Sequence, residues 1–292
     1  MSTFTGDGLY QRAAQLKLSG AGTQGSAVFS YKVYKKHPRA ARAFYAEIAR
    51  VALACVPGKA HRALDRLVCR CPGTHVDTCI YASGHAGLQM VRHYTMNIDG
   101  LSGSACSKSQ EALSPHVIEM HGNVTRLVCP VCGYKGAAQK HQLLRMTQRK
   151  DVVCPNRSKA HPADSVMRFG MLLYDDEEAE YLIATSTILH LMQSDAARID
   201  AVVWIGVSFM QSATVGYFRE LELHARSAHP LTHIICNPDE DCVWNLLSAL
   251  HDPDSVLERL VFFQESAEQL IPNLLQSVCT CVGSPRTGEH DP

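Results

Sequence analysis

Apolar residues recur at two spacings along the chain, and each spacing predicts a different kind of element. From Pro38 onward, apolar positions follow one another every three to four residues, which predicts a helix that stops before Pro57-Gly58. A second, shorter helix is predicted over residues 60–68. The run 201–206 is instead almost continuously apolar, which is typical of a strand buried on both faces of a sheet.

Further short apolar runs predict strands over residues 88–98, 117–120 and 233–236. Strands and helices alternate along the chain, and this order predicts an α/β fold with a Rossmann-like parallel sheet. The segment 123–165 is poor in large apolar residues and rich in Cys, Pro, Lys and Arg. We therefore expect a small module there that something other than a hydrophobic core holds together.

Composition and charge narrow the class of protein. Of the 292 residues, 46% are apolar and 19% charged, so a packed core is expected and chain-wide disorder is excluded. Lys and Arg balance Asp and Glu at 28 each, which gives no overall basic field, so no direct binding of nucleic acid is expected. No apolar run approaches the roughly 20 residues that span a bilayer, so no membrane partner is expected. The first ten residues lack the apolar core of a secretory signal, which predicts an intracellular protein.

Twelve cysteines in a reducing compartment indicate metal ligands or buried thiols before disulfides. Cys129 and Cys132 stand three positions apart and a glycine follows them, which is typical of one half of a zinc knuckle. Cys154 begins a second half, but the position expected for its partner holds Arg157, and His161 is the nearest substitute ligand. The segment is interpreted as a structural zinc site with four ligands, and the alternative is two buried thiols and an isolated one.

A second group of Cys and His residues precedes this one and has ligand chemistry without regular spacing. Its members are Cys69, Cys71, His75 and Cys79. The irregular spacing and the neighbouring Pro and Gly residues favour an inserted loop over residues 69–87, with metal binding as the alternative.

Polar or small residues follow four predicted strands at the point where each strand ends. Because the carboxyl ends of parallel strands meet at one edge of a sheet, residues there are well placed to bind a nucleotide. A histidine among them is a candidate general base, since its usual pKa lies near neutral pH. Asn and Asp also occupy turns for backbone reasons, and a single histidine is often structural, so the signal comes from the set as a whole. The set is Asn97, Asp99, His121, Gly206, Ser208 and Asn237.

These segments also occur in the order and at the spacing of a known family. The segments that carry the pattern are Tyr94-Thr95-Met96-Asn97-Ile98-Asp99-Gly100-Leu101, Met120-His121-Gly122, Cys129 with Cys132, Gly206-Val207-Ser208 and Cys236-Asn237. Residues 168–176, which end in Tyr174-Asp175-Asp176, add a sixth segment. Over residues 4–275 the chain resembles the sirtuin family, and its style is closest to the fungal histone-deacetylating branch.

The resemblance implies an activity, a cofactor and a partner. It implies NAD-dependent removal of acyl groups from lysine, with release of nicotinamide and O-acyl-ADP-ribose. The substrate would be an acylated lysine peptide or a histone tail, and the kinship places the protein in the nucleus or the cytoplasm. The zinc ion would be structural, because a closed ligand set leaves no open position for substrate.

The resemblance also assigns roles to individual residues. His121 matches the catalytic histidine of the family. The residues implied to position the nicotinamide end of NAD are Asn97, Ile98 and Asp99. Those implied to hold the adenosine side are Gly206, Ser208 and Asn237. The implied zinc ligands are Cys129, Cys132, Cys154 and, as the substitute, His161.

The expected domain organisation follows the same resemblance. A Rossmann-like NAD-binding domain is expected to comprise residues 1–122 and 166–280, with a helical insertion over about residues 10–68 and an extra loop over 69–87. A small zinc-binding module is expected over residues 123–165. The end of the chain, residues 281–292, is expected to be a disordered tail.

Some positions depart from the family pattern and leave alternatives open. Met96 replaces a Gln, Val207 replaces a Thr, and Arg157 replaces the fourth zinc Cys. Residues 4–10 resemble the end of the cofactor loop, which would put the first strand and its glycine loop before Met1 and make NAD binding poor; a second register uses Gly20-Ala21-Gly22. Beside an active deacylase, the alternatives are a degenerate sirtuin fold that binds a nucleotide or protein without turnover, and a zinc-containing interaction protein.

Overall fold

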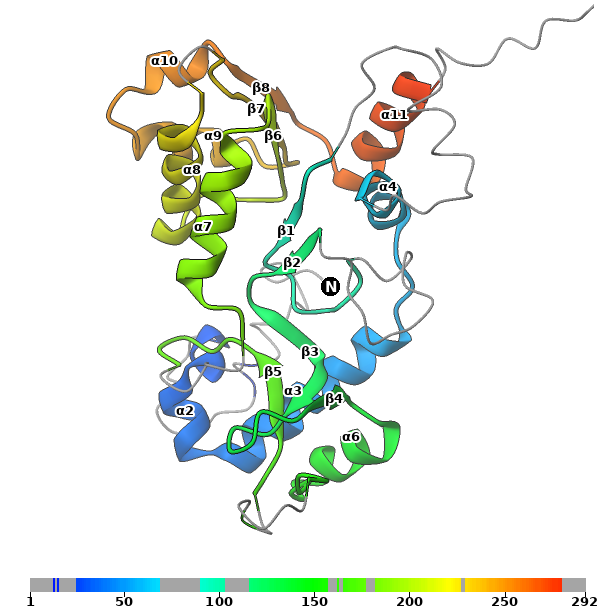
Figure 1. The fold of residues 1–292 in the computed structure, drawn as a ribbon. Helices are drawn as coiled ribbons and strands as arrows, with labels where there is room; N and C mark the ends of the chain where they lie inside the picture. Colours follow the sequence, from blue (N-terminus) through cyan, green and yellow to red (C-terminus); the bar gives the residue numbers. More distant parts are fainter. Residues whose placement is uncertain are drawn as a thin grey trace, which may run out of the picture. The chain divides into compact units, whose positions relative to one another are not determined.

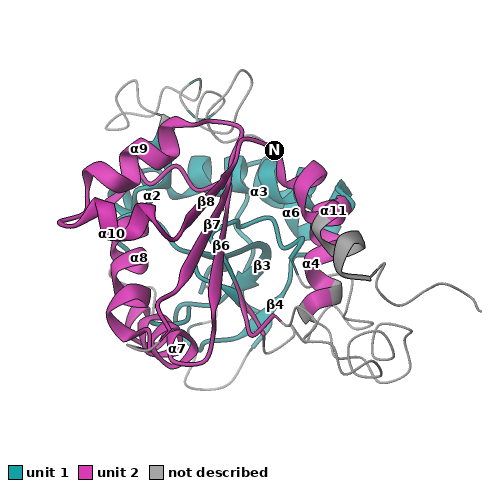
Figure 2. Cartoon of the chain, turned by 90° about the horizontal axis from the view of Figure 1, so that it is seen from above, with its two compact units in different colours: residues 1–56, 94–113, 118–184 teal, residues 57–93, 114–117, 185–292 magenta. Residues whose placement is uncertain are grey.

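A computed structural model describes most of the chain as two compact units. The described residues are 13, 15, 25–68, 90–102, 116–156, 162, 165–176, 182–226 and 229–279. Unit 1 comprises residues 1–56, 94–113 and 118–184, and unit 2 comprises residues 57–93, 114–117 and 185–292 (Figure 2). These bounds differ from the expected domain bounds, which stay a prediction. The predictions made for residues 4–10, 20–22, 69–87 and 281–292, and for Arg157 and His161, lie outside the described residues.

Unit 1 is built on one long helix that packs against a three-stranded sheet (Figure 1). The predicted helix is confirmed as α3 (Pro38–Ala54), which has Pro38 in its first turn, where a missing N–H costs nothing. The sheet has the antiparallel order β4-β3-β5. The other elements of the unit are η1 (Gly25–Phe29), α2 (Tyr31–Lys36), β3 (Gly122–Val128), β4 (Lys135–Ala137), α6 (Lys140–Thr147) and β5 (Arg168–Met171).

The segment 123–165 shares the core of this unit. Leu127 of β3 and Leu143 and Met146 of α6 are each 1% exposed, and they belong to one buried cluster with Phe44 and Ile48 of α3. The expectation that this segment lacks a hydrophobic core was wrong. Its few large apolar residues suffice because α3 supplies the facing side of the core.

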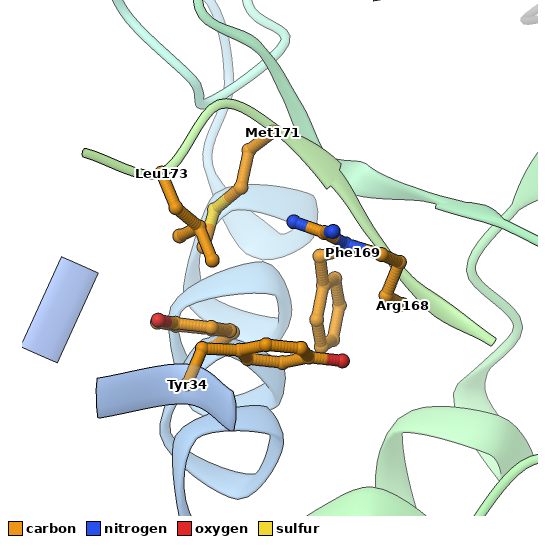
Figure 3. A pocket seen from close by; sticks show the side chains of 6 residues that line it. Tyr34, Arg168, Phe169, Met171 and Leu173 are labelled. Carbon is orange, nitrogen blue, oxygen red and sulfur yellow. The ribbon is translucent and has the colours of Figure 1, made fainter. Parts of the chain in front are cut away.

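A buried arginine joins β5 to α2. The Arg168 guanidinium lies 2.5 Å from the Asp176 carboxylate, and both side chains are almost fully buried. The same guanidinium lies 5.4 Å from the ring of Tyr31 and 5.1 Å from that of Tyr34, so two tyrosines cover the buried cation. Figure 3 shows the surrounding hollow, which is too narrow to hold a water molecule. It is lined by Tyr34, Tyr45, Arg168, Phe169, Met171 and Leu173.

Unit 2 contains the predicted parallel sheet, with strand order β6-β7-β8. Its strands are β6 (Ala201–Ile205), β7 (Thr232–Cys236) and β8 (Leu260–Phe263). Its helices are α4 (Lys59–Val68), α7 (Thr185–Ala196), α8 (Ser212–His224), α9 (Asp241–Ser248), α10 (Pro253–Leu257) and α11 (Ala267–Cys279), of which α4 confirms the second predicted helix (Figure 1). Within the part of the chain that the structure describes, no helix combines the length and apolar character needed to cross a bilayer.

The first strand of this sheet is not buried on both faces along its length, so that prediction was wrong. On one face, Trp204 packs against Phe218 of α8. On the other face, Ile205 packs with the helix pair α4 and α11, whereas Val203 is 43% exposed. The helix pair covers only the carboxyl end of the strand. The apolar sequence of the strand does not show which of its residues a distant helix covers.

A buried polar chain ties the sheet of unit 2 to its helices. His233 of β7 is fully buried, and its Nδ1 accepts a hydrogen bond of 3.0 Å from the Trp204 indole. The Nε2 of His233 therefore carries the proton and donates to Glu222 at 2.8 Å. Glu222 also pairs with Arg259 at 2.8 Å. Burial opposes ionisation of Glu222, but His233 and Arg259 bring the pKa of its carboxyl down to about 2.

Candidate functional site

Two short paired strands carry the central candidates, namely β1 (His93–Thr95) and β2 (Val117–Glu119). The amide of His93 bonds the carbonyl of His116 at 2.8 Å, and the amide of Met120 bonds the carbonyl of Thr95 at 2.9 Å. Partner numbers rise together in the two strands, so the pair is parallel. The residues that follow β1 and β2 therefore leave from the same edge of this pair. The sequence predicted four such strands in one sheet, whereas β1-β2 and β6-β7-β8 are separate sheets among the described residues.

His121 lies against the loop that follows β1. Burial lowers the pKa of His121 below its usual value, and the backbone of Met96, the residue just before Asn97, opposes this shift only in part. The imidazole is therefore neutral near pH 7, and its second nitrogen is left with a lone pair that can accept a proton.

The loop after β1 is held in place by its own side chains and by β3. The amide of Asn97 bonds Thr95 Oγ1 at 3.1 Å, and the amide of Leu101 bonds Asp99 Oδ1 at 3.0 Å. The carbonyl of Ile98 accepts from the amide of Val124 in β3 at 2.8 Å. One oxygen of Asp99 thus fixes the turn, whereas the side chain of Asn97 is exposed and bonds to none of the described residues.

Two residues directly after His121 shape the site. The sequence named Gly122 only as part of the segment around His121, and it missed Asn123. Gly122 has a φ of 72°, and a Cβ there would lie 2.2 Å from the carbonyl oxygen of Gly170 in β5. Asn123 is 4% exposed. Its side-chain Nδ2 donates to the Glu119 carboxylate at 2.7 Å, and its Oδ1 accepts from the backbone amide of Thr125 at 2.8 Å. A Gly-Asn pair inside an apolar strand was the available signal, since neither residue favours a strand interior.

Glu119 is a second buried polar group that the sequence did not single out. Burial raises the pKa of its carboxyl, while Arg126 at 3.7 Å and the bond from Asn123 oppose that rise. The nearby Asp99 carboxylate raises it further. Glu119 precedes His121 by two residues and Asp99 lies close enough to act on it, so unit 1 gathers a histidine and two acids near the end of β2.

Unit 2 places the remaining candidates after β6 and β7. The amide of Gly206 bonds the carbonyl of Cys236 at 2.9 Å, and the side-chain amide of Asn237 donates to the carbonyl of Val207 at 3.1 Å. Asn245 of α9 donates to the carbonyl of Ser208 at 3.1 Å. The side chains of two asparagines thus hold the backbone of the three-residue loop after β6 in place.

Gly206 in this loop and Asn237 after β7 differ in what they offer to a ligand. Gly206 has a φ of 64°, and no atom lies within 4 Å of the position its Cβ would take, so this side of the loop is open. Asn237 is 6% exposed, and its side-chain Oδ1 accepts from the backbone amide of Asp239 at 3.0 Å. The side chain of Asn237 is therefore engaged with the protein and positions the loop.

The three cysteines of the predicted zinc site come together in unit 1. The sulfur atoms of Cys129, Cys132 and Cys154 lie within 4.8 Å of one another, and those of Cys132 and Cys154 are 3.7 Å apart. Sulfur ligands at about 2.3 Å from a tetrahedral zinc ion would lie about 3.8 Å apart, so this spacing fits the metal. Burial opposes ionisation of Cys132, but hydrogen bonds from the Tyr134 backbone and from Asn156 lower its pKa to about 7. The cluster fits a zinc site, and His161 as fourth ligand stays a prediction.

The candidate residues for NAD fall into both units. His121, Asn97, Ile98 and Asp99 belong to unit 1, whereas Gly206, Ser208 and Asn237 belong to unit 2. Within unit 1, His121 and the loop of residues 96–99 adjoin each other. Within unit 2, the loop of residues 206–208 and Asn237 adjoin each other. The NAD-binding role of each residue stays a prediction.

Comparisons with known proteins agree on one family. The model of the Sir2 family matches residues 1–212, which is more than two thirds of the chain. Among solved structures, a complex of a Sir2 homologue mutant with ADP-ribose has a TM-score of 0.60 at 17% identity, over 98% of this chain and 89% of that one. A complex of a Sir2 homologue with NAD has a TM-score of 0.57 at 15% identity, over 94% and 87%. Sir2Tm bound to a propionylated peptide has a TM-score of 0.55 at 17% identity, over 92% and 89%. No curated protein matches the chain significantly.

Proposed function

Because the chain belongs to the Sir2 family, we propose that it is an NAD-dependent protein-lysine deacylase. The observation that carries the proposal is the His121 imidazole, which follows a parallel strand pair, lies beside the backbone of Met96 and has a pKa lowered by burial. A neutral histidine beside an exposed asparagine is the arrangement that a general base next to a polar ligand requires. The proposed substrate is an acylated lysine peptide, of which a histone tail is one example.

NAD would supply a ribose carbon that takes the acyl oxygen as nicotinamide leaves. The unprotonated ring nitrogen of neutral His121 is the atom that would accept the proton of the ribose hydroxyl during the reaction. The backbone of Met96 lies beside the ring and limits its freedom, which reduces the entropy lost in orienting the base. Asn97 offers an exposed amide beside it, and the two bonded turns on either side of Ile98 keep this amide in place.

The residues of unit 2 are the ones that the family pattern assigns to the adenosine side of NAD, and their local geometry suits that role. The open side of Gly206 leaves room for a ligand to approach the backbone, and Ser208 adds a hydroxyl. The loop is fixed by Asn237 and Asn245, so its backbone groups need no reordering on binding. Two of the similar solved structures are complexes with ADP-ribose and with NAD, which supports a dinucleotide as the ligand.

A zinc ion at Cys129, Cys132 and Cys154 would be structural. Cys129 and Cys154 are buried, and the turn between Cys129 and Gly133 is closed by a backbone bond of 2.9 Å. A metal held there would fasten β3 to the segment before β5 and leave the chemistry to His121.

Two positions favour a catalytically silent member of the family as the second candidate. Met96 places a thioether where the family pattern has an amide, and Val207 places a methyl group where the pattern has a hydroxyl. Each change removes a hydrogen-bonding group from a loop that faces the proposed ligand. A protein of this kind would bind a nucleotide or a protein partner without turnover.

The test compares the activity of His121→Ala with that of the unmodified chain. The substrates are NAD and an acetyl-lysine peptide, and the readout is the release of nicotinamide. His141→Ala, on the exposed face of α6, is the matched control. We expect His121→Ala to lose roughly 10²- to 10⁴-fold in kcat, as for loss of a general base, while calorimetry shows NAD binding unchanged. Equal turnover in the two variants would remove His121 from the proposed role. NAD binding without nicotinamide release in the unmodified chain would favour the silent member instead.

A further inference from the structure

The charge of the chain is strongly divided between its two units. Unit 1 holds 18 of the 28 Lys and Arg residues and 12 of the 28 Asp and Glu residues, which gives a formal charge of +6. Unit 2 holds the other 10 and 16, which gives −6. The overall charge of zero therefore describes neither unit, and the expectation that it excludes a polyanion does not apply to unit 1 alone.

Much of this positive charge gathers around a single carboxylate, Asp151. Arg39, at the start of α3, bonds Asp151 Oδ2 at 2.9 Å, and Arg42 bonds Oδ1 at 2.5 Å. Arg145 of α6 bonds the backbone carbonyl of the same residue at 3.2 Å. Hydrogen bonds from Arg39 hold the pKa of the Asp151 carboxyl below its usual value. One acid thus draws three arginines together.

Exposed cations continue from this point in both directions along the chain. Lys35 and Lys36 end α2, directly before α3, and Arg149 and Lys150 follow α6, directly before Asp151. The side chains of all four are exposed. Among the described residues, no carboxylate lies within ion-pair distance of any of the four. The basic surface consists of Lys35, Lys36, Arg39, Arg145, Arg149 and Lys150.

Only part of this surface serves the fold, through the bonds of Arg39 and Arg145 to Asp151. The other four cations are exposed and have no carboxylate partner among the described residues, and placing like charges together costs free energy unless a partner of opposite charge compensates for it. The basic surface also uses none of the residues assigned to NAD or zinc. A ligand with closely spaced negative charges would offset the repulsion and explain the clustering.

We propose that the basic surface binds the phosphate backbone of a nucleic-acid duplex without reading its sequence. Three of the six cations are arginines, whose planar forks suit phosphate oxygens, and a duplex carries one charge for about every 1.7 Å of its axis. A single strand would call for free aromatic rings on which bases stack. The tyrosines of α2 are already stacked: Tyr31 lies 6.2 Å from Tyr34, and Tyr34 lies 6.4 Å from Tyr45. A duplex is therefore the better fit.

The experiment measures binding of the full chain to a fluorescent 20-base-pair DNA duplex by anisotropy, from 50 to 200 mM salt. Five to six phosphate contacts predict a slope of about −5 for log K against log salt. The variant Lys35→Gln/Lys36→Gln should reduce the size of this slope by about 2, for every duplex sequence tested. The matched control is Lys135→Gln/Lys140→Gln, which removes the same charge from exposed positions of unit 1 outside the basic surface.

Three results would overturn the proposal. The first is the absence of duplex binding at 50 mM salt. The second is an equal change of slope in the two double variants, which would show that total charge and not the basic surface matters. The third is binding of a poly-glutamate peptide as tight as that of the duplex, which would identify an acidic protein as the partner. None of these depends on deacylation, so the proposal and the proposed function fail separately.

Discussion

Replacing Gly122 by alanine tests the packing that places His121. Gly122 has a φ of 72°, a conformation that costs an L residue about 1–2 kcal/mol. The added methyl group would also lie 2.2 Å from the Gly170 carbonyl oxygen and 2.9 Å from Leu182 Cδ2. Because Gly170 is backbone in a paired strand, relief requires β3 and β5 to separate, and overpacking of this kind costs about 1–3 kcal/mol more. The expected loss in the free energy of unfolding is about 2–5 kcal/mol.

Gly133→Ala is the matched control in the same unit. Gly133 has a φ of 69°, but nothing lies within 4 Å of the position its Cβ would take. This variant therefore bears only the conformational cost of about 1–2 kcal/mol. The difference between the two variants isolates the clash with β5 from the cost of the left-handed backbone.

The assay is urea denaturation with zinc present throughout, followed by far-ultraviolet circular dichroism. Tryptophan fluorescence does not serve here, because both tryptophans, Trp204 and Trp244, belong to unit 2. Hydrogen exchange of peptides from β3 locates the change, since only Gly122→Ala should speed exchange there. Equal losses of stability in the two variants would refute the argument that the carbonyl of Gly170 excludes a side chain at this position.

Two further predictions concern the zinc cluster of unit 1 and the half-buried carboxylate of Glu222 in unit 2. Cys132→Ser should abolish stoichiometric zinc in the purified protein, measured by mass spectrometry of the metal, whereas Cys55→Ser, at an exposed thiol, should retain it; zinc in both would contradict the ligand assignment. Glu222 should stabilise unit 2 above its ordinary pKa of 4.5, and this contribution, on the order of 2–3 kcal/mol, should disappear as the pH falls from 4.5 towards 2. Glu222→Gln should lower the free energy of unfolding at pH 7 and make its decline between pH 5 and 3 less steep. Glu240→Gln, at an exposed position at the start of α9, should behave like the unmodified chain. A decline as steep in Glu222→Gln as in the unmodified chain would contradict the stabilising role of Glu222.

Local patterns predicted the elements whose formation depends on neighbouring residues. The helix from Pro38 follows from apolar spacing and a proline at its start, and the parallel sheet of unit 2 follows from apolar strands alternating with helices. The pair Cys129 and Cys132 lies within one turn, so its spacing alone shows that both sulfur atoms can reach one metal ion. Such features can be predicted from the sequence because they depend on a few residues that are close together in the chain.

The extent of burial was less predictable, since it depends on elements far away in the sequence. Val203 looks like a residue buried on two sides, yet the pair α4 and α11 covers only the end of its strand. The segment 123–165 looks too polar for a core, yet α3 supplies the missing half. Neither outcome follows from the residues of the segment itself.

The sequence by itself determined which chemical groups the protein possesses: a histidine before a glycine at a strand end, polar residues after four strands, and three cysteines at ligand spacing. The tertiary structure decided what each group is free to do. It engaged the side-chain amide of Asn237 with the carbonyl of Val207, placed the His121 ring beside the backbone of Met96, and put the carbonyl of Gly170 where a side chain at position 122 would lie. It also separated charges that sum to zero into a basic and an acidic unit. The physical reason is that hydrogen bonds, burial and electrostatic fields depend on distances in space, which residues far apart in the chain acquire only on folding.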